Sequence, residues 1–307
     1  MSEILGLHHM TAICGDAQTN IDFYTGVLGL RMVKLTVNFD DPTAYHLYYG
    51  DGAASPGTIL TFFPYPTAQM GRHGNGQAIV TSLSVPSGSY GYWRDRLKDV
   101  AAPSERDGVI DFADPDGLLL RIVPDPHYKL LAPWDRSPVP VEHQIGGMHS
   151  VTLQVDQLDR TASLLMQVMG YRHDPDIEVP EYVFFVGKGG MSQRVDVSNI
   201  GYTNGRPGRG TVHHIAFRTP DDDTQLKLRE TLVGVGASVS EVRDRDYFHS
   251  IYFREPGGVL FEIATDGPGF TADEPLESLG TGLRLPKMHE PARAKIEAAL
   301  PKLELPI

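Results

Sequence analysis

Two pairs of adjacent histidines and one isolated carboxylate are the residues of this chain whose types and settings most clearly permit chemistry. His8-His9 and His213-His214 each lie in a short segment of otherwise apolar, strand-forming residues, and Glu262 stands between a phenylalanine and an isoleucine. Two imidazoles and one carboxylate on one face are the ligands with which proteins hold non-haem Fe(II) and leave positions open for other molecules. A metal site is therefore the first hypothesis.

Composition limits the class of protein. The chain has 307 residues, 41% of them hydrophobic, which fits a soluble globular protein of one to three domains. It has no apolar run near the roughly 18 residues of a membrane span, and its first residues do not resemble a signal peptide, so we expect a cytoplasmic location. A net charge of −12 argues against nucleic acid or a membrane as partner. The single cysteine, Cys14, excludes a disulfide framework and a multi-thiolate metal site.

Self-similarity along the chain predicts four βαβββ units in tandem. Asp114–Arg121 matches Glu255–Glu262 position for position, and each is a turn containing proline and glycine that leads into a hydrophobic strand. The first strands of units one, three and four also align with one another. We therefore predict an α+β fold in which the units pair into curved mixed sheets that cup a metal.

Hydrophobic periodicity and turn residues give the expected elements. The predicted strands are Leu5–Cys14, Arg31–Phe39, Tyr45–Tyr49, Thr58–Phe63, Gln77–Val85, Leu118–Val123, Gly147–Thr152, Arg194–Val197, Thr211–Arg218 and Leu260–Ala264. The predicted helices are Ala17–Leu28, Tyr90–Asp99, Arg160–Met169, Asp222–Val233 and, in the C-terminal tail, the amphipathic Ala292–Leu300. A proline-rich connector, Pro124–Pro140, separates two predicted domains, residues 1–130 and 145–270, and residues 271–307 form an extension.

Comparison of the four units singles out one histidine from each pair. On the first strands, His9 aligns with His214, whereas unit three has Ser150 at this position and unit two has no histidine in residues 78–82. A lone His-His pair in a strand usually consists of one buried, hydrogen-bonded ring and one surface ring. Two pairs at equivalent positions of a repeat instead favour a metal site.

The last strands contribute the carboxylate. Glu262 of unit four aligns with Arg121 of unit two and roughly with Thr61 of unit one, and unit three offers only Asp196, in a loose alignment. An unpaired glutamate buried between hydrophobic residues is costly without a cation. His9, His214 and Glu262 are therefore the predicted metal ligands.

Strand geometry constrains the neighbours of these ligands. Side chains alternate between the two faces of a strand, so only one histidine of each pair can point into a given cavity. Thr11 lies on the same face as His9. By this parity His8 and His213 face away from the cavity, unless the strand twists or bulges at these residues.

Five segments give the chain a resemblance to a known family. They are LHHMT at 7–11, DFYTGVLGL at 22–30, TVNFDDP at 36–42, YHLYYGD at 45–51 and PGTILTFFP at 56–64. With them the chain resembles the vicinal oxygen chelate superfamily of glyoxalases, bleomycin-resistance proteins and extradiol dioxygenases. Within it, residues from about Gly6 to Asp266 resemble the dioxygenases that cleave hydroquinone rings.

The resemblance implies a site. It assigns the iron to the three ligands already singled out, and it implies that five further residues surround the metal: His8, Thr11, His213, Arg245 and Tyr252. The alternative interpretations are a solvated charge at a strand end for Arg245 and a core aromatic for Tyr252. Relatives that cleave catechols usually take all three ligands from their C-terminal half. Here Ser150 vacates that half's first position, so units one and four are expected to assemble the cup.

The activity implied by the resemblance is an Fe(II)-dependent, extradiol-type insertion of O2 into a hydroxylated aromatic ring, with a substituted or unsubstituted hydroquinone as substrate. Mn(II) suits the same ligands. The expected partners are a small aromatic diol and O2, without nucleic acid or membrane, and a homo-oligomer is left open. His8 or His213 is the candidate acid–base group. Arg245 can hold the second hydroxyl or stabilise negative charge, and Tyr252 can donate to substrate or bound oxygen.

Two other functions share this fold. Glyoxalase-like isomerases and thiol transferases commonly use four protein ligands or two equivalent carboxylates, whereas the partner positions here hold Thr61 and Arg121. A non-enzymatic member would bind a small molecule in the cup without needing three ligand residues. The C-terminal tail can pack on the core or on a neighbouring subunit.

Overall fold

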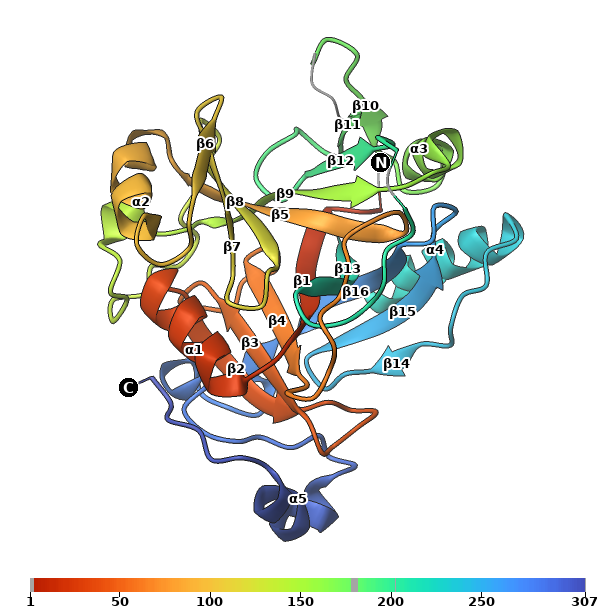
Figure 1. The fold of residues 1–307 in the computed structure, drawn as a ribbon. Helices are drawn as coiled ribbons and strands as arrows, with labels where there is room; N and C mark the ends of the chain where they lie inside the picture. Colours follow the sequence, from red (N-terminus) through yellow and green to blue (C-terminus); the bar gives the residue numbers. More distant parts are fainter. Residues whose placement is uncertain (1–2, 178–181, 202, 307) are drawn as a thin grey trace.

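Two curved, eight-stranded mixed sheets form most of the protein, which a computed structural model describes for residues 3–177, 182–201 and 203–306 (Figure 1). In spatial order, the first sheet contains β14 (Arg243–Asp244), β15 (Phe248–Arg254), β16 (Leu260–Pro268), β13 (Thr211–Thr219), β1 (Gly6–Cys14), β4 (Ile59–Pro64), β3 (Tyr45–Gly50) and β2 (Arg31–Val37). The second contains β10 (Arg172–His173), β11 (Tyr182–Phe185), β12 (Arg194–Ser198), β9 (Gly147–Gln154), β5 (Gln77–Pro86), β8 (Leu119–Asp125), β7 (Val109–Ala113) and β6 (Ser104–Arg106).

Each sheet combines two of the four units, and the two units of the first sheet come from opposite ends of the repeat. The first sheet combines units one and four through the antiparallel pair β1–β13, and the second combines units two and three through β5–β9. Each central strand also pairs in parallel with the last strand of its own unit. The predicted α+β fold of paired βαβββ units is confirmed. Because both sheets take strands from residues 1–130 and 145–270, the division into these two domains stays a prediction.

The helices follow the first strand of each unit, as predicted. They are α1 (Ala17–Ile21), α2 (Tyr90–Leu97), α3 (Leu158–Gln167), α4 (Asp222–Gly234) and, in the tail, α5 (Arg293–Ala299). The expected helix over residues 17–28 continues past α1 as a π-helical turn over residues 22–27. In units one and four, Asp16 and Asp221 cap α1 and α4 by accepting the backbone N–H of the residue three positions on.

The C-terminal extension packs on the first sheet of its own chain. The fully buried ammonium of Lys34 on β2 binds the carboxylates of Asp273 and Glu274, and it lies 4.6 Å from the centre of the Tyr247 ring. Near the end of the chain, the Tyr45 hydroxyl donates to the Pro301 carbonyl at 2.8 Å. A buried charge is stable only when it is paired, so the ion pairs of Lys34 fix the extension against the sheet.

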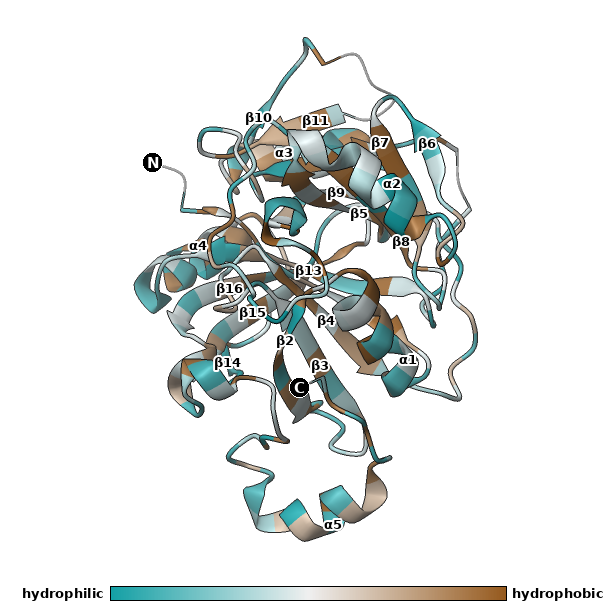
Figure 2. Ribbon diagram, turned by 90° about the vertical axis from the view of Figure 1, so that its left-hand side faces the viewer, coloured by the Kyte–Doolittle hydropathy of each residue, from teal (hydrophilic) through white to brown (hydrophobic). Residues whose placement is uncertain are grey.

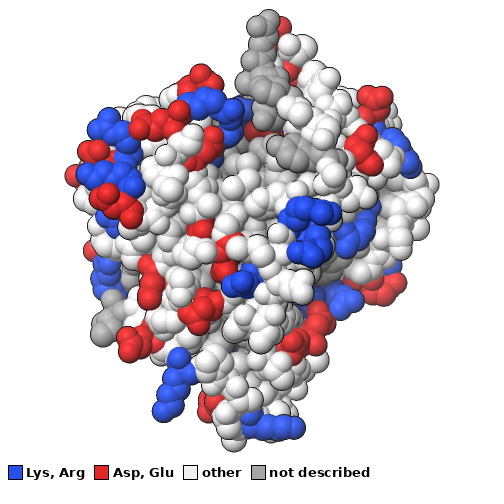
Figure 3. Space-filling view, in the orientation of Figure 1, with Lys and Arg blue, Asp and Glu red and all other residues white. Residues whose placement is uncertain are grey.

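Hydrophobic strands form the interior of the molecule, and charged groups are dispersed outside it. Figure 2 shows hydrophobic segments along β5, β8 and β9, whereas much of α4 is hydrophilic. On the face drawn in Figure 3, acidic and basic side chains form small separate groups. That face therefore offers no continuous basic surface for a nucleic-acid backbone. None of the helices in the described residues has the length and apolar character needed to span a membrane.

The matching turns of units two and four are built in the same way. In unit two, the Asp114 carboxylate accepts the backbone N–H groups of Asp116 and Leu118 and the hydroxyl of Tyr24. In unit four, Glu255 accepts the Val259 N–H and the hydroxyl of a threonine on α3. Each turn is thus fixed by a buried acid that also binds a helix of the preceding unit.

Asp114 makes the stability of the fold depend on pH. Burial raises the pKa of its carboxyl from 3.8 to about 6, although the amides of Leu118 and Asp116 partly oppose the shift. Because the folded protein prefers the protonated acid, this contribution to stability is complete below pH 3.8 and is lost as the pH rises through 6.

Between pH 5 and pH 7, we therefore expect the free energy of unfolding of the protein to fall by about 1 kcal/mol more than that of the variant D114N. Asparagine keeps an acceptor for the two backbone amides but does not titrate. Denaturant titrations of both proteins at the two pH values measure the difference. If the two proteins differ in free energy of unfolding by the same amount at both pH values, the pH dependence does not come from Asp114.

Candidate metal centre

Both histidine pairs lie at β-bulges of the central strand pair. In the register between β1 and β13, Leu7 pairs with Phe217 and His9 with Ala216, so His8 is an extra residue on β1. Thr11 pairs with His214 and Ala12 with Val212, so His213 is an extra residue on β13. A bulge re-aims the side chains around it. Side-chain alternation therefore need not hold at the positions where the two pairs occur.

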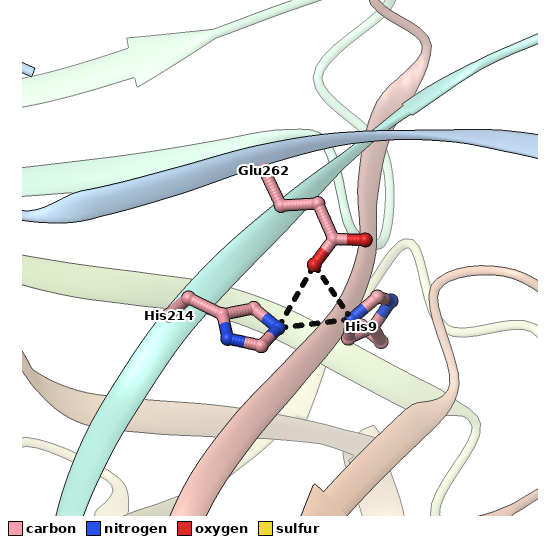
Figure 4. Close-up of side chains that lie close together, drawn as sticks. All are labelled: His9, His214 and Glu262. Atoms are coloured by element: carbon pink, nitrogen blue, oxygen red, sulfur yellow. Dashed lines mark hydrogen bonds and ion pairs between the residues drawn. The ribbon is translucent and has the colours of Figure 1, made fainter. Parts of the chain in front are cut away.

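The three predicted ligands converge on one point, as Figure 4 shows. Nε2 of His9 and Nε2 of His214 lie 3.3 Å apart, and the Glu262 oxygen Oε2 lies 3.4 Å from the first and 2.9 Å from the second. All three residues are buried. Within the described ranges, no other three His, Cys, Asp or Glu side chains converge in this way.

The geometry of these atoms fits a metal ion. Glu262 Oε2 is buried and forms no well-aligned hydrogen bond with either ring, although both Nε2 atoms are close. Two ligands at right angles on bonds of about 2.1 Å are about 3 Å apart, which matches the three separations. A buried carboxylate oxygen facing two imidazole nitrogens without a donor is expected where a cation binds.

Neighbouring side chains orient the ligands. Nδ1 of His9 lies 2.9 Å from Nδ1 of His8, and Nδ1 of His214 lies 2.7 Å from Nδ1 of His213. A ring that offers Nε2 to a metal carries its proton on Nδ1, so each ligand donates to the histidine before it. The other oxygen of Glu262, Oε1, accepts the Ser250 hydroxyl.

The surroundings favour the protonation states that a metal requires. Burial by itself would raise the pKa of Glu262, but the neighbouring His9 and His214 lower it well below its usual value. Burial lowers the pKa of His214, with Glu262 opposing the shift. A charged carboxylate and a neutral imidazole are the forms that bind metal, so little proton rearrangement is needed.

A pocket of about 360 Å³ opens onto the three ligands. Its walls are largely aromatic and its polar groups come mainly from β3, β15 and the loop after β2; the residues that line it besides the ligands are Ile13, Asn38, Phe39, Asp40, His46, Tyr48, Phe63, Tyr65, His213, Arg245, Phe248 and Tyr252. Such a concave site with a few polar groups is typical of small-molecule binding.

Three of the five residues expected around the metal line this pocket. His213 does so because of its bulge, and its ring is partly exposed. The Arg245 Nε lies 3.4 Å from the Tyr252 hydroxyl. The same guanidinium pairs with Asp40 at 3.3 Å and lies over the Phe39 ring.

The other two expected residues lie outside the pocket wall. His8 is buried and lines a separate, smaller cavity of about 250 Å³, away from the wall of the larger pocket as the parity rule predicts. Thr11 is fully buried, and its hydroxyl lies 2.7 Å from that of Thr61. The pocket residues His46, Tyr48 and Phe248 carry no signal in the sequence that points to the site. They lie on β3 and β15, and no local sequence pattern reveals how these strands align with the strands that carry the three ligands.

Strand register identifies the residues equivalent to Glu262. In the pairing of β13 with β16, Glu262 is level with Ala216, which is two residues after His214. The residues at the same position of the last strand in units one, two and three are Thr61, Arg121 and Asp196. This confirms the alignment made from the sequence. Arg121 pairs with Asp111 at 2.5 Å, and Asp196 pairs with Arg194 at 2.6 Å.

Comparison with known proteins agrees with this architecture. A family model described as the Glyoxalase/Bleomycin resistance protein/Dioxygenase superfamily matches residues 6–122 and 147–263, which are the two halves of the repeat. The chain belongs to this superfamily. A glyoxalase I structure from Zea mays shares the fold at 15% identity and a TM-score of 0.61, covering 85% of this chain and 92% of that one.

More similar relatives carry dioxygenase names. "Putative ring-cleaving dioxygenase MhqO" of Bacillus subtilis is 44% identical over 98% of this chain and 97% of that protein. "Chlorohydroquinone/hydroquinone 1,2-dioxygenase" of Sphingobium indicum is 35% identical over 91% of both chains. The crystal structure of a "putative dioxygenase" from Bacillus subtilis has a TM-score of 0.91 at 42% identity, covering 100% of this chain and 99% of that one.

The convergence of three ligands predicts that a divalent metal stabilises the protein. At a metal concentration 100 times the dissociation constant, the gain is about 2.7 kcal/mol, which raises Tm by roughly 5 °C. Calorimetric scans with and without Fe(II) under argon measure this shift.

H214A is expected to lose most of this shift. The matched control is H149A, which removes the histidine at the equivalent bulge of the second sheet. Equal shifts in H214A and H149A would show that the metal binds elsewhere.

Proposed function

We propose that this protein is an Fe(II)-dependent dioxygenase that inserts both atoms of O2 into the ring of a hydroxylated aromatic compound, with hydroquinones as its substrate class. The observation that carries the proposal is the cluster of three ligands at the floor of an aromatic-walled pocket. The names of the relatives, ring-cleaving dioxygenase and hydroquinone 1,2-dioxygenase, support it. A cytoplasmic location stays a prediction, and the oligomeric state stays open.

His9, His214 and Glu262 would hold the metal from one side and leave the pocket side open. Bound there, Fe(II) supplies a positive charge that acidifies a ring hydroxyl and a route for electrons from the ring to O2. Mn(II) suits the same ligands, because the order of divalent-metal affinities separates the two ions only weakly. The protein's own contribution is to orient the ring and to stabilise charge.

The aromatic walls would hold the substrate ring. Phe63 and Phe248 lie on β4 and β15, and Phe39 follows β2, so apolar groups reach the pocket from three sides. Aromatic rings pack favourably edge to face or offset against one another. A volume of about 360 Å³ suits a small aromatic molecule.

His213 would act as a hydrogen-bond donor to the reacting oxygens. Partial loss of water around its ring, and the adjacent His214, lower its pKa to about 3, so the ring is neutral at pH 7. When His214 offers Nε2 to a metal, its Nδ1–H donates to Nδ1 of His213, so the proton of His213 would reside on Nε2. This tautomer agrees with the donating half of the predicted acid–base role and not with the accepting half. His8, outside the pocket, would only orient His9.

Arg245 and Tyr252 would stabilise negative charge that develops on the substrate. Burial favours loss of the Arg245 charge, but Tyr252, Asp40 and Glu262 raise the pKa of the guanidinium above its usual value. Burial also raises the pKa of Tyr252, which therefore stays a neutral donor. Fixed donors in a site with little water stabilise developing anions strongly.

Oxygen consumption tests the proposed activity directly. The Fe(II)-loaded protein is expected to consume one O2 for each hydroquinone, with loss of the aromatic absorbance of the ring, because both oxygen atoms enter the product. An oxygen electrode and mass spectrometry of the product made under ¹⁸O2 measure this. E262Q serves as the matched control that lacks the charged ligand. No uptake with hydroquinone, methylhydroquinone or catechol would refute the proposal.

The proposed role of His213 predicts a loss of turnover without a loss of bound iron. H213A is expected to keep its iron content and to lose roughly 10²-fold in kcat, the usual effect of removing one donor to a developing anion. Iron analysis alongside steady-state kinetics separates this loss from failure to bind metal. H149A again serves as control. Unchanged turnover of H213A with normal iron would remove the role.

A further inference from the structure

A row of side chains crosses the first sheet from the far wall of the pocket to the ligand His214. Strand register places Tyr48 on β3 level with Thr61 on β4, and Thr61 level with Thr11 on β1. Thr11 is in turn level with His214 on β13. Residues level with one another on neighbouring strands share a face of the sheet. Because adjacent strands are about 4.8 Å apart, the row from Tyr48 to His214 is roughly 14 Å long, measured along the curved sheet.

The two residues between them are small and bind each other. The hydroxyls of Thr11 and Thr61 lie 2.7 Å apart, and both side chains are fully buried beneath the pocket. Thr61 occupies the position that Glu262 occupies in unit four. A carboxylate therefore reaches the metal position from the side of unit four, whereas the side of unit one has only a short side chain. On the side of unit one, the residue that follows Thr61 in this row is Tyr48.

The Tyr48 hydroxyl is held firmly at the end of this row. It lies 2.8 Å from Nδ1 of His46, and Nε2 of the same ring lies 2.8 Å from the Thr61 hydroxyl. The Tyr48 ring packs at 4.0 Å from the His46 ring and at 5.3 Å from that of Phe270, measured between centres. A phenol hydroxyl can donate once and accept twice, so one bond to His46 leaves capacity for a ligand.

The repeat shows that Tyr48 has a counterpart in unit four. Tyr252 is level with Glu262 in the same way that Tyr48 is level with Thr61. Both tyrosines line the pocket. Tyr252 is on the side of the carboxylate ligand and has Arg245 as its neighbour. Tyr48 is on the open side and has His46, so the two tyrosines meet different parts of a bound molecule.

We propose that Tyr48 binds the ring hydroxyl that does not coordinate the metal, and that it thereby selects para-diols over ortho-diols. His46 is the positioning residue that orients the Tyr48 hydroxyl. The inference rests on the proposed function. The two oxygens of a para-diol point in opposite directions, so a ring with one oxygen at the metal directs the other across Thr61 to the far wall. An ortho-diol brings both oxygens to the metal and leaves Tyr48 without a partner.

Binding without turnover tests this assignment. The Fe(II)-loaded protein and Y48F are titrated under argon with hydroquinone and with phenol, which lacks the second hydroxyl, and the heat of binding is measured. Loss of one hydrogen bond is expected to weaken hydroquinone binding about five- to tenfold, with less than about a twofold change for phenol. H46A is expected to give the same selective loss, because the Tyr48 hydroxyl is then unoriented. In turnover, the preference of Y48F for hydroquinone over catechol falls by a similar factor.

Y65F is the matched control, because the Tyr65 hydroxyl lines the same pocket but binds Asn38 and Asp41. It is expected to leave the ratio of hydroquinone to phenol affinity unchanged. Equal weakening of both ligands in Y48F would mean that Tyr48 only shapes the pocket, and unchanged hydroquinone binding would mean that it makes no such contact; either result overturns the proposal. If the unaltered protein binds neither ligand, the proposed function itself fails.

Discussion

The antiparallel pairing of β1 with β13 is the constraint on which the site depends. It brings together His9 and His214, which are 205 residues apart in the sequence, and the parallel pairing of β13 with β16 adds Glu262. The bulges at His8 and His213 occur within this same pairing. No local segment contains more than one of the three side chains, so the candidate metal site forms only when the first and last units are joined. Closing so long a loop costs entropy, and a bound metal would help to offset that cost.

The electrostatics of the cluster follow from this assembly. When both rings carry their protons on Nδ1, three acceptor atoms meet at the centre, and the protons are donated outward, from His9 to His8 and from His214 to His213. Ser250 satisfies the other oxygen of Glu262. Such outer contacts set the tautomer and direction of ligands before the metal arrives. The protein thus prepares the site for a cation, and the bulges supply the acceptors that make this possible.

The sequence was sufficient for the repeat, for most of the longer elements and for the three side chains that converge, because these rest on period, turn chemistry and alignment of like segments. It also placed His8 away from the pocket wall by side-chain alternation. It could not predict on which face of its strand His213 lies, because side-chain alternation fails at a bulge and the position of a bulge depends on the partner strand. It did not point to His46 and Tyr48, because their relation to the ligands is a register across β3, β4, β1 and β13. Cross-strand register is a property of the assembled sheet, not of any one strand.

The two sheets show how one backbone plan supports different sites. Where the first sheet has Glu262, the second has Arg121 and Asp196, and both are neutralised by a neighbouring opposite charge. The two units of the first sheet also differ from each other, because the position that Glu262 occupies in unit four is occupied in unit one by the short side chain of Thr61. Fold similarity alone therefore does not fix the chemistry of a site, because equivalent positions of one backbone plan carry a carboxylate at Glu262, a short hydroxyl side chain at Thr61 and ion-paired charges at Arg121 and Asp196.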